Sequence, residues 1–430
     1  MDFLQYLLEF TKIVLSMWWL WLAIILYFPA KEIYLWAIRE LKFFIPEKFV
    51  LLEIKIPEEV EKTPKAMENV FHTIWSLYDP PANIRDYWIK GKWLLYYTLE
   101  IVGKRGEVHL YIRVPESRRN LVESAIYAEY PNAEIIETED YVYKFGRELP
   151  NEEYDLWGAD MALKKPEVYP IRTYEYWETE RTPEGKRVDP LAAIFEAFSN
   201  LKEGEEAWIQ IKICPITDDE HPYLEESQKL INQIMKRPEE KKPGILEPLY
   251  LSKIPSDIWQ AIIHGKPVPE RAKEKIEEKS PFFELGLMRL SPGEAEALRL
   301  IEQNLSKYVY EANIRFLYIA KRDIFSPSRG VPPICGAFSQ FSTINLNGFA
   351  PDKTKTKTAP WFFEERRLFV KKRRIFRFYA NRLWPFHRKP YILSTAELAT
   401  LFHFPGKDVA PAIGVPRVAI RKAGAPPTLP

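Results

Sequence analysis

Cysteine and glycine are both scarce in this 430-residue chain. The two cysteines, Cys214 and Cys335, are too few for the disulfide framework of a secreted scaffold, and nothing around them has metal-ligand spacing. The 17 glycines stand against 36 prolines, which favours defined breaks between elements over flexible linkers. Apolar residues at 46% and charged residues at 28% exclude a disordered, collagen-like or polytopic membrane chain. The length suggests about three domains in a reducing, cytosol-like compartment.

The sequence motifs of nucleotide and hydrolytic chemistry are missing as well. No window reads GxxxxGK[ST], GxGxxG, GxSxG or HExxH. The most metal-like run, Asp218–His221, consists of consecutive side chains that must diverge, and its flanking prolines favour an exposed turn. We therefore expect no catalytic residues, no metal and no cofactor, and predict that the chain is not an enzyme.

A long apolar run lies near the N-terminus. Residues 13–30, IVLSMWWLWLAIILYFPA, carry no charge. As a helix they would cover about 27 Å, close to the ~30 Å hydrocarbon core of a bilayer. Within a segment 1–48, we predict one transmembrane helix followed by an interfacial helix. Its membrane anchors are aromatic: Trp18, Trp19, Trp21 and Tyr27.

Two other readings of this run are a cleaved signal peptide and a buried core helix. The leader contains Asp2 and Glu9 and lacks a small-residue cleavage site, and core helices seldom carry 18 uninterrupted apolar residues at the chain start. Lysine and arginine are more frequent after the run than before it, which predicts that the N-terminus lies outside the plasma (inner) membrane. The lipid bilayer is then a partner, and the C-terminal domains are cytoplasmic.

The stretch 49–150 has strand and helix patterns in the order β-α-β-β-α-β. Strand patterns lie at 49–56, 92–103, 107–115 and 133–143, and helix patterns at 63–77 and 116–131. This is the order of the ferredoxin-like split βαβ arrangement. We predict a ferredoxin-like domain here.

A looser version of the same order is predicted for 151–350. The strand patterns are 169–178, 205–215, 282–290 and 312–321, the helix patterns are 191–201, 292–308 and 334–342, and a helical insertion occupies about 216–280. The predicted class is α+β: a transmembrane helix, two tandem ferredoxin-like units, and a basic, proline-rich C-terminal region at 351–430.

Charge is divided unevenly along the chain. Residues 351–430 carry 17 Lys and Arg against five Asp and Glu, a net charge of +12, so that residues 1–350 carry −11. Between 366 and 389 there is no acidic residue, and aromatic residues are interleaved with ten basic ones: Arg366, Arg367, Lys371, Lys372, Arg373, Arg374, Arg377, Arg382, Arg388 and Lys389. Such a segment fits nucleic acid, anionic lipid headgroups, or packing onto the acidic body or an acidic partner.

A capping-box pattern, Ser394 to Glu397, predicts a helix over AELATLF that ends at Pro405-Gly406. We expect a partner protein to dock on this helix and the residues that follow it. The expected contacts are Glu397, Leu398, Leu401, Phe402 and Phe404.

Several stretches of the sequence resemble one uncharacterised bacterial family over most of residues 45–430. They are TLEIVGKRGEVHLYIRVPESRRNLVESAIYAEYPNAEI, QFSTINLNGFAPDKTKTKT, LSTAELATLFHFPG and RKAGAPPTLP. The resemblance is to the N-terminal half of membrane-anchored proteins linked to conjugation and type IV secretion. In many of them this half continues into a HerA-like or coupling-protein-type P-loop ATPase, and this sequence ends where that ATPase would begin.

The resemblance implies a role in a transport machine. We expect a non-enzymatic, single-pass scaffold of an oligomeric type IV secretion-like complex that moves DNA or protein, with a HerA-like ATPase supplied in trans. The alternative is a membrane-tethered nucleic-acid-binding module that uses residues 366–389.

Overall fold

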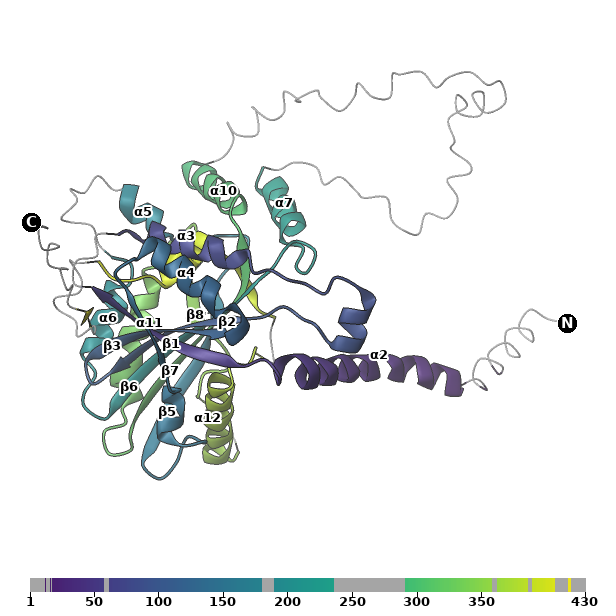
Figure 1. The fold of residues 1–430 in the computed structure, drawn as a ribbon, viewed down its shortest axis with the longest axis horizontal. Helices are drawn as coiled ribbons and strands as arrows, with labels where there is room; N and C mark the ends of the chain where they lie inside the picture. Colours follow the sequence, from purple (N-terminus) through teal and green to yellow (C-terminus); the bar gives the residue numbers. More distant parts are fainter. Residues whose placement is uncertain are drawn as a thin grey trace, which may run out of the picture.

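The protein is an α+β fold built on one ten-stranded sheet, as seen in a computed structural model. The structure describes residues 12, 16, 18–57, 62–179, 189–235, 291–357, 362–385, 389–406 and 417–418. Nine strands pair antiparallel, and the two-residue strand β10 (Arg417–Val418) pairs parallel to β1. Figure 1 follows the chain through the sheet and its helices. The predicted α+β class is confirmed.

The first half of the sheet follows the expected element order. It consists of β1 (Phe49–Pro57), α3 (Pro64–Trp75), β2 (Tyr97–Lys104), β3 (Glu107–Pro115), the short helix η3 (Glu116–Arg118), α4 (Arg119–Glu129) and β4 (Glu134–Thr138). The strands lie antiparallel in the order β4-β1-β3-β2, which is that of the split βαβ arrangement. A two-residue turn joins β2 to β3, and both of its residues, Arg105 and Gly106, have positive φ, as a type I′ hairpin requires.

The second half repeats this order with a long insertion. It consists of β5 (Tyr154–Leu163), α5 (Tyr174–Thr179), α6 (Ala192–Ser199), β6 (Glu205–Pro215), β7 (Val309–Lys321), α11 (Pro327–Ser339) and β8 (Phe349–Pro351). The antiparallel order β8-β5-β7-β6 mirrors that of the first half. Between β6 and β7 lie α7 (Tyr223–Ile234) and α10 (Pro292–Leu305), which pack on each other. A short strand β9 (Tyr391–Ser394) also pairs with β7.

The two halves are joined edge to edge. Strand β2 pairs antiparallel with β6 along its whole length, from Tyr97 opposite Ile213 to Lys104 opposite Glu206. The mirrored strand orders on either side of this seam give the sheet a pseudo-two-fold arrangement. The units are therefore halves of one sheet, and the larger core contains residues of both halves.

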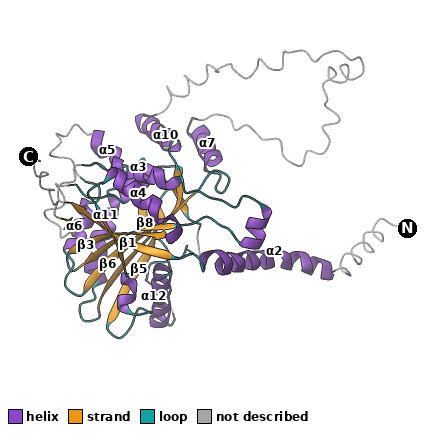
Figure 2. Ribbon diagram, in the orientation of Figure 1, coloured by secondary structure: helices purple, strands orange, loops and turns teal. Residues whose placement is uncertain are grey.

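Helices cover the two faces of the sheet unequally. Apolar side chains of α3, α4, α6, α11 and α13 (Thr395–Leu401) pack with strand residues such as Leu99, Ile209 and Phe316 in the larger core. On the other face a smaller core contains residues of α12 (Glu364–Ala380) and of the short helix η4 (Tyr141–Phe145). Figure 2 shows α12 apart from the helical layer formed by α3 and α4.

The N-terminal helix α2 (Trp18–Ile38) extends away from the sheet (Figure 1). It runs through Pro29 without a break and continues into a π-helical turn, η1 (Arg39–Phe44), so the two expected N-terminal helices form one element. A second such turn, η2 (Asp86–Lys90), packs beside it. Across the described residues, we find no helix that combines the length and the unbroken apolar character required to traverse a bilayer.

Some predicted elements were wrong. Residues 169–178, predicted as a strand, form a loop and α5, and the first strand of the second half is β5, which was not predicted. The strand predicted for 133–143 ends at Thr138, and η4 follows. The strand predicted for 282–290 lies outside the described residues.

Candidate functional site

Helix α12 contains most of the basic segment, and one of its faces packs against the sheet. Glu364 and Glu365 in the first turn and Arg377 in the last complement the helix dipole. Ile375, Phe376 and Tyr379 are buried at helical spacing against Trp208 and Leu317 of the sheet.

Lys372 belongs to this inward face. It is buried, and its Nζ lies 2.6 and 2.7 Å from the two carboxylate oxygens of Asp155 on β5. Its role is to fasten α12 to the sheet, so it is not available to an external ligand. This corrects its prediction as a nucleic-acid or lipid contact.

A buried polar row crosses four strands just beyond α12. Glu100, Gln210, Arg315 and Asp160 are successive register partners on β2, β6, β7 and β5. Arg315 Nε donates to Asp160 Oδ1 at 2.7 Å, and Gln210 Nε2 donates to Glu100 Oε1 at 2.9 Å. The segment after α12 covers this row.

Arg382, in the segment that follows α12, forms ion pairs with the Glu100 end of this row. Its guanidinium is 1% exposed and donates to both oxygens of Glu100, at 3.0 and 3.2 Å, and to the carboxylate of Asp140. Burial raises the pKa of Glu100, but the charge and hydrogen bonds of Arg382, with those of Tyr141 and Gln210, outweigh it and lower the pKa. Arg382 is thus a structural cation. Its prediction as a nucleic-acid or lipid contact is wrong because its partners lie within the chain.

The outer face of α12 is different. Arg366, Arg367, Arg374 and Arg377 are exposed. Within the described part of the chain, none of these four has an ion-pair or side-chain hydrogen-bond partner. Arg373 is also exposed, but it pairs with Glu148 and lies over the ring of Phe369.

A second line of cations runs beside β5. In the stretch 352–357, Thr354 and Thr356 are buried and accept hydrogen bonds from the backbone N–H groups of Asp160 and Gly158, at 2.8 and 3.1 Å. The lysines between them are exposed: Lys353, Lys355 and Lys357. This stretch is thus fixed to the edge of the sheet.

The two lines of cations are joined by Lys371, whose Nζ donates to the carbonyl oxygen of Lys357 at 3.0 Å. We call the solvent-facing set the basic face: Lys353, Lys355, Lys357, Arg366, Arg367, Arg374 and Arg377. Of the other predicted contacts, Lys389 is exposed and Arg388 lies outside the described residues. The lysines 353–357 were missed, although the alternation KTKTKT could have indicated them.

The predicted docking helix α13 is internal. The side chains of Glu397, Leu398, Leu401, Phe402 and Phe404 are at most 2% exposed and belong to the core or its hydrogen bonds. Glu397 closes the expected capping box with Ser394 and also accepts from the N–H of Ile171 at 2.8 Å. Burial raises its pKa. These residues present no surface to a partner, which corrects that prediction.

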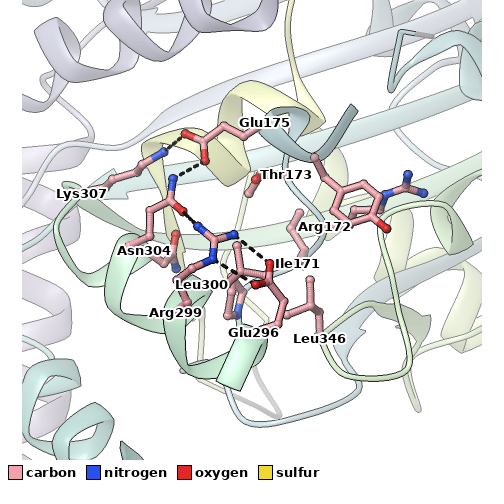
Figure 3. Close-up of a pocket in the computed structure, with 13 residues that line it drawn as sticks. Ile171, Arg172, Thr173, Glu175, Glu296, Arg299, Leu300, Asn304, Lys307 and Leu346 are labelled. Carbon is pink, nitrogen blue, oxygen red and sulfur yellow. Dashed lines mark hydrogen bonds and ion pairs between the residues drawn. The ribbon is translucent and has the colours of Figure 1, made fainter. Parts of the chain in front are cut away.

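A cavity of about 200 Å³ lies between α10 and residues 170–176 (Figure 3). Lys307 pairs with Glu175 at 2.5 Å, and Arg299 pairs with Glu296 at 2.8 Å. Figure 3 shows Arg172 set apart from these pairs, with its guanidinium over the rings of Tyr176 and Trp177. Lys307 and Arg299 are already paired with carboxylates, and Arg172 is stacked on two rings, so the cavity alone assigns no function.

The run Asp218–His221 forms a turn in which the side chains diverge, as expected. Asp218 accepts from the N–H of Leu224, and Glu220 accepts from Thr217. His221 Nε2 lies 2.7 Å from Glu167 Oε1, with Glu226 nearby.

His221 is held as a cation. Hydrogen bonds to Glu167 and Glu311 raise its pKa to about 10. A metal ligand must be a neutral imidazole, so near pH 7 this geometry is an ion pair.

The predicted membrane anchors all lie on α2. Trp18, Trp19 and Trp21 are in its first turns, and Tyr27 is exposed.

The comparisons with known proteins agree with the sequence resemblance in part. No curated protein matches the chain. A family model described as a domain of unknown function, DUF8128, matches residues 95–412, from just before β2 to beyond α13. The expected membership of an uncharacterised family is therefore met, while the link to type IV secretion and conjugation stays a prediction. Because the match covers well over half of the chain, the protein belongs to the DUF8128 family.

Proposed function

We propose that this protein is a non-enzymatic scaffold that attaches to a membrane through α2 and carries its sheet domain on the cytoplasmic side. The observation that carries the proposal is the exposure of apolar side chains on successive residues of α2. Residues 25–28 are all exposed, with Ile25 at 65% and Phe28 at 64%. No described residue covers any side of this part of the helix. A helix that is apolar all round is normally buried in a protein core or a bilayer.

The base of α2 supports the same placement. Tyr34 donates to the carbonyl oxygen of Trp88 on η2 at 2.9 Å, and the guanidinium of Arg39 lies 3.7 Å from the ring centroid of Trp93. On η2 itself, Ile89 is exposed. Aromatic rings mixed with cations and exposed aliphatic residues are typical of a membrane interface.

The transport role rests on the sequence resemblance. We place the scaffold in an oligomeric type IV secretion-like or conjugative complex, with a HerA-like ATPase as its partner. Because residues 397–404 are internal, that ATPase must contact other surfaces of the chain.

The attachment is tested by vesicle flotation of the full-length protein after a carbonate wash. Wild type is expected to float. Replacing Ile25 and Phe28 by Asp puts two charges on the apolar part of α2, at a cost of up to about 3 kcal/mol each within the hydrocarbon, which should leave most of the protein at the bottom of the gradient. The control replaces Tyr143 and Ile344, which are 58% and 94% exposed on the sheet domain, by Asp and should float as wild type does.

Wild-type protein that stays at the bottom would refute membrane attachment. The partner is tested separately, by purification from native membranes in mild detergent. Recovery of a P-loop ATPase is expected, and its absence would remove the ATPase from the proposal while leaving the attachment intact.

A further inference from the structure

We propose that the basic face binds the phosphate backbone of single-stranded nucleic acid. The inference goes beyond membrane attachment and does not depend on it. It rests on which cations of the basic segment form ion pairs within the chain and which are exposed without a partner among the described residues.

The fold pairs some of these cations and leaves others without a partner. Lys372 and Arg382 are buried in ion pairs, and Arg373 is paired at the surface. Arg366, Arg367, Arg374 and Arg377 are exposed and without a partner in the described part of the chain. Arg374 and Arg377 are three residues apart on one helix face, a spacing at which like charges destabilise a helix. A polyanion on this face would relieve that repulsion.

The kind of cation favours phosphate. All four unpartnered residues of α12 are arginines, whose planar donors match phosphate oxygens in pairs. Lys353, Lys355 and Lys357 add a second set of exposed point charges, on the turn that is fixed beside β5. The hydrogen bond from Lys371 to Lys357 fixes this line against the helix.

The burial pattern of α12 argues against a bilayer as the occupant. An amphipathic helix that binds membranes inserts its apolar face into the interface. The apolar face of α12 already lies against the sheet, through Ile375, Phe376 and Tyr379. Four arginines that have no partner among the described residues remain outside, and the exposed apolar side chains lie only towards the start of the helix, so anionic lipid would be held mainly by charge.

Exposed aromatic rings favour single strands over duplex. Phe362 and Phe363, at the start of α12, are 73% and 78% exposed, and Phe369 is 41% exposed one turn after Arg366. Unpaired bases can stack on such rings, whereas the bases of a duplex are already stacked. Phosphate contacts from the basic face and stacking on these rings then act on the same strand.

Binding is tested with full-length protein in detergent and a fluorescein-labelled 30-nucleotide oligo(dT), by anisotropy between 50 and 200 mM salt. Seven phosphate contacts on a single strand predict a slope of log K against log salt near −5, so affinity should fall about a thousandfold over this range. Replacing the four arginines by Gln should reduce the slope by about 3.

The control replaces four exposed cations outside the basic face by Gln: Lys62, Arg85, Lys229 and Arg299. This variant carries the same loss of charge and should retain the wild-type slope. A second variant, with Lys353, Lys355 and Lys357 changed to Gln, tests the other line of cations and should reduce the slope by about 2. Thermal melting and circular dichroism establish that each variant is folded. If the arginine variant does not fold, the lysine variant decides.

Three results would overturn the inference. Wild type could fail to bind, or bind without salt dependence. The control could lose as much affinity as the arginine variant. Third, the arginine variant could lose binding to phosphatidylglycerol vesicles while keeping its affinity for oligo(dT), which would make the basic face a lipid contact. The preference for single strands has its own test. It would be refuted if a 30-base-pair duplex bound as tightly as oligo(dT) and if replacing Phe362 and Phe363 by Ala left both affinities unchanged.

Discussion

Replacing Arg382 by Met removes the cation from a site that contains two carboxylates. Glu100 is fully buried and Asp140 is about one-fifth exposed, and Arg382 donates to both. The methionine side chain fills most of the same space but donates nothing. Glu100 keeps hydrogen bonds from Tyr141 and Gln210, but no charge balances it.

The expected loss follows from this geometry. Removing one partner of a buried ion pair typically costs 3–5 kcal/mol, so we expect the free energy of unfolding to fall by about 4 kcal/mol at pH 7. Part of this loss should return in the double variant Arg382→Met/Glu100→Gln, since a neutral amide needs no counter-charge. The two substitutions should therefore be non-additive by more than about 1 kcal/mol.

Urea denaturation of the detergent-solubilised protein, followed by tryptophan fluorescence, measures these values. The control is Arg377→Met, five residues earlier in the same basic segment and exposed, for which we expect a change below about 0.5 kcal/mol. If Arg382→Met costs no more than Arg377→Met, Arg382 is not a buried structural cation. Arg382 would then have to be added to the residues of the basic face.

Two further predictions concern the sheet and its border. The pKa of His221 is raised to about 10 from an ordinary value near 6.5, so its pairing stabilises the fold fully below pH 6.5 and is lost as the pH rises through 10. Melting temperatures of wild type and His221→Gln should thus converge between pH 7 and 10.5, and a constant difference would contradict this. Thr354→Val should cost about 1–3 kcal/mol in urea denaturation because it leaves the buried N–H of Asp160 without an acceptor. The exposed control Thr73→Val should cost far less, and equal losses would contradict the role of the Thr354 hydroxyl.

The fold was predictable where local patterns and tertiary structure agree. The strands β1, β3, β6 and β7 alternate or are continuously apolar, and the two-residue turn at Arg105-Gly106 is visible in the sequence. Strand β5 was missed because it contains Asp155, Gly158 and Asp160, which are unfavourable in strands. Their partners, Lys372 and Arg315, come from distant parts of the chain, so no local pattern could reveal that these charges are neutralised.

The candidate site was predictable as a segment but not residue by residue. The helical period does place Lys372 on the side of Ile375, Phe376 and Tyr379, and this could have identified it as inward-facing. Arg382 follows the end of the helix, and its partners lie more than 200 residues earlier, so only the tertiary structure separates it from Arg377. Likewise, the sequence of α13 predicts a helix with apolar side chains. It does not indicate whether those side chains contact a partner protein or the chain's own core.

The pairing of β2 with β6 makes this single polypeptide the equivalent of a two-fold dimer whose halves are covalently linked. A true homodimer would offer each of its binding surfaces twice and in opposite directions. Here α2 precedes only the first half, and the lysines of the basic face lie beside β5, in the second half. A ligand of either surface would therefore meet the molecule with one-to-one stoichiometry and in a single orientation, a polarity that a symmetric pair could not provide.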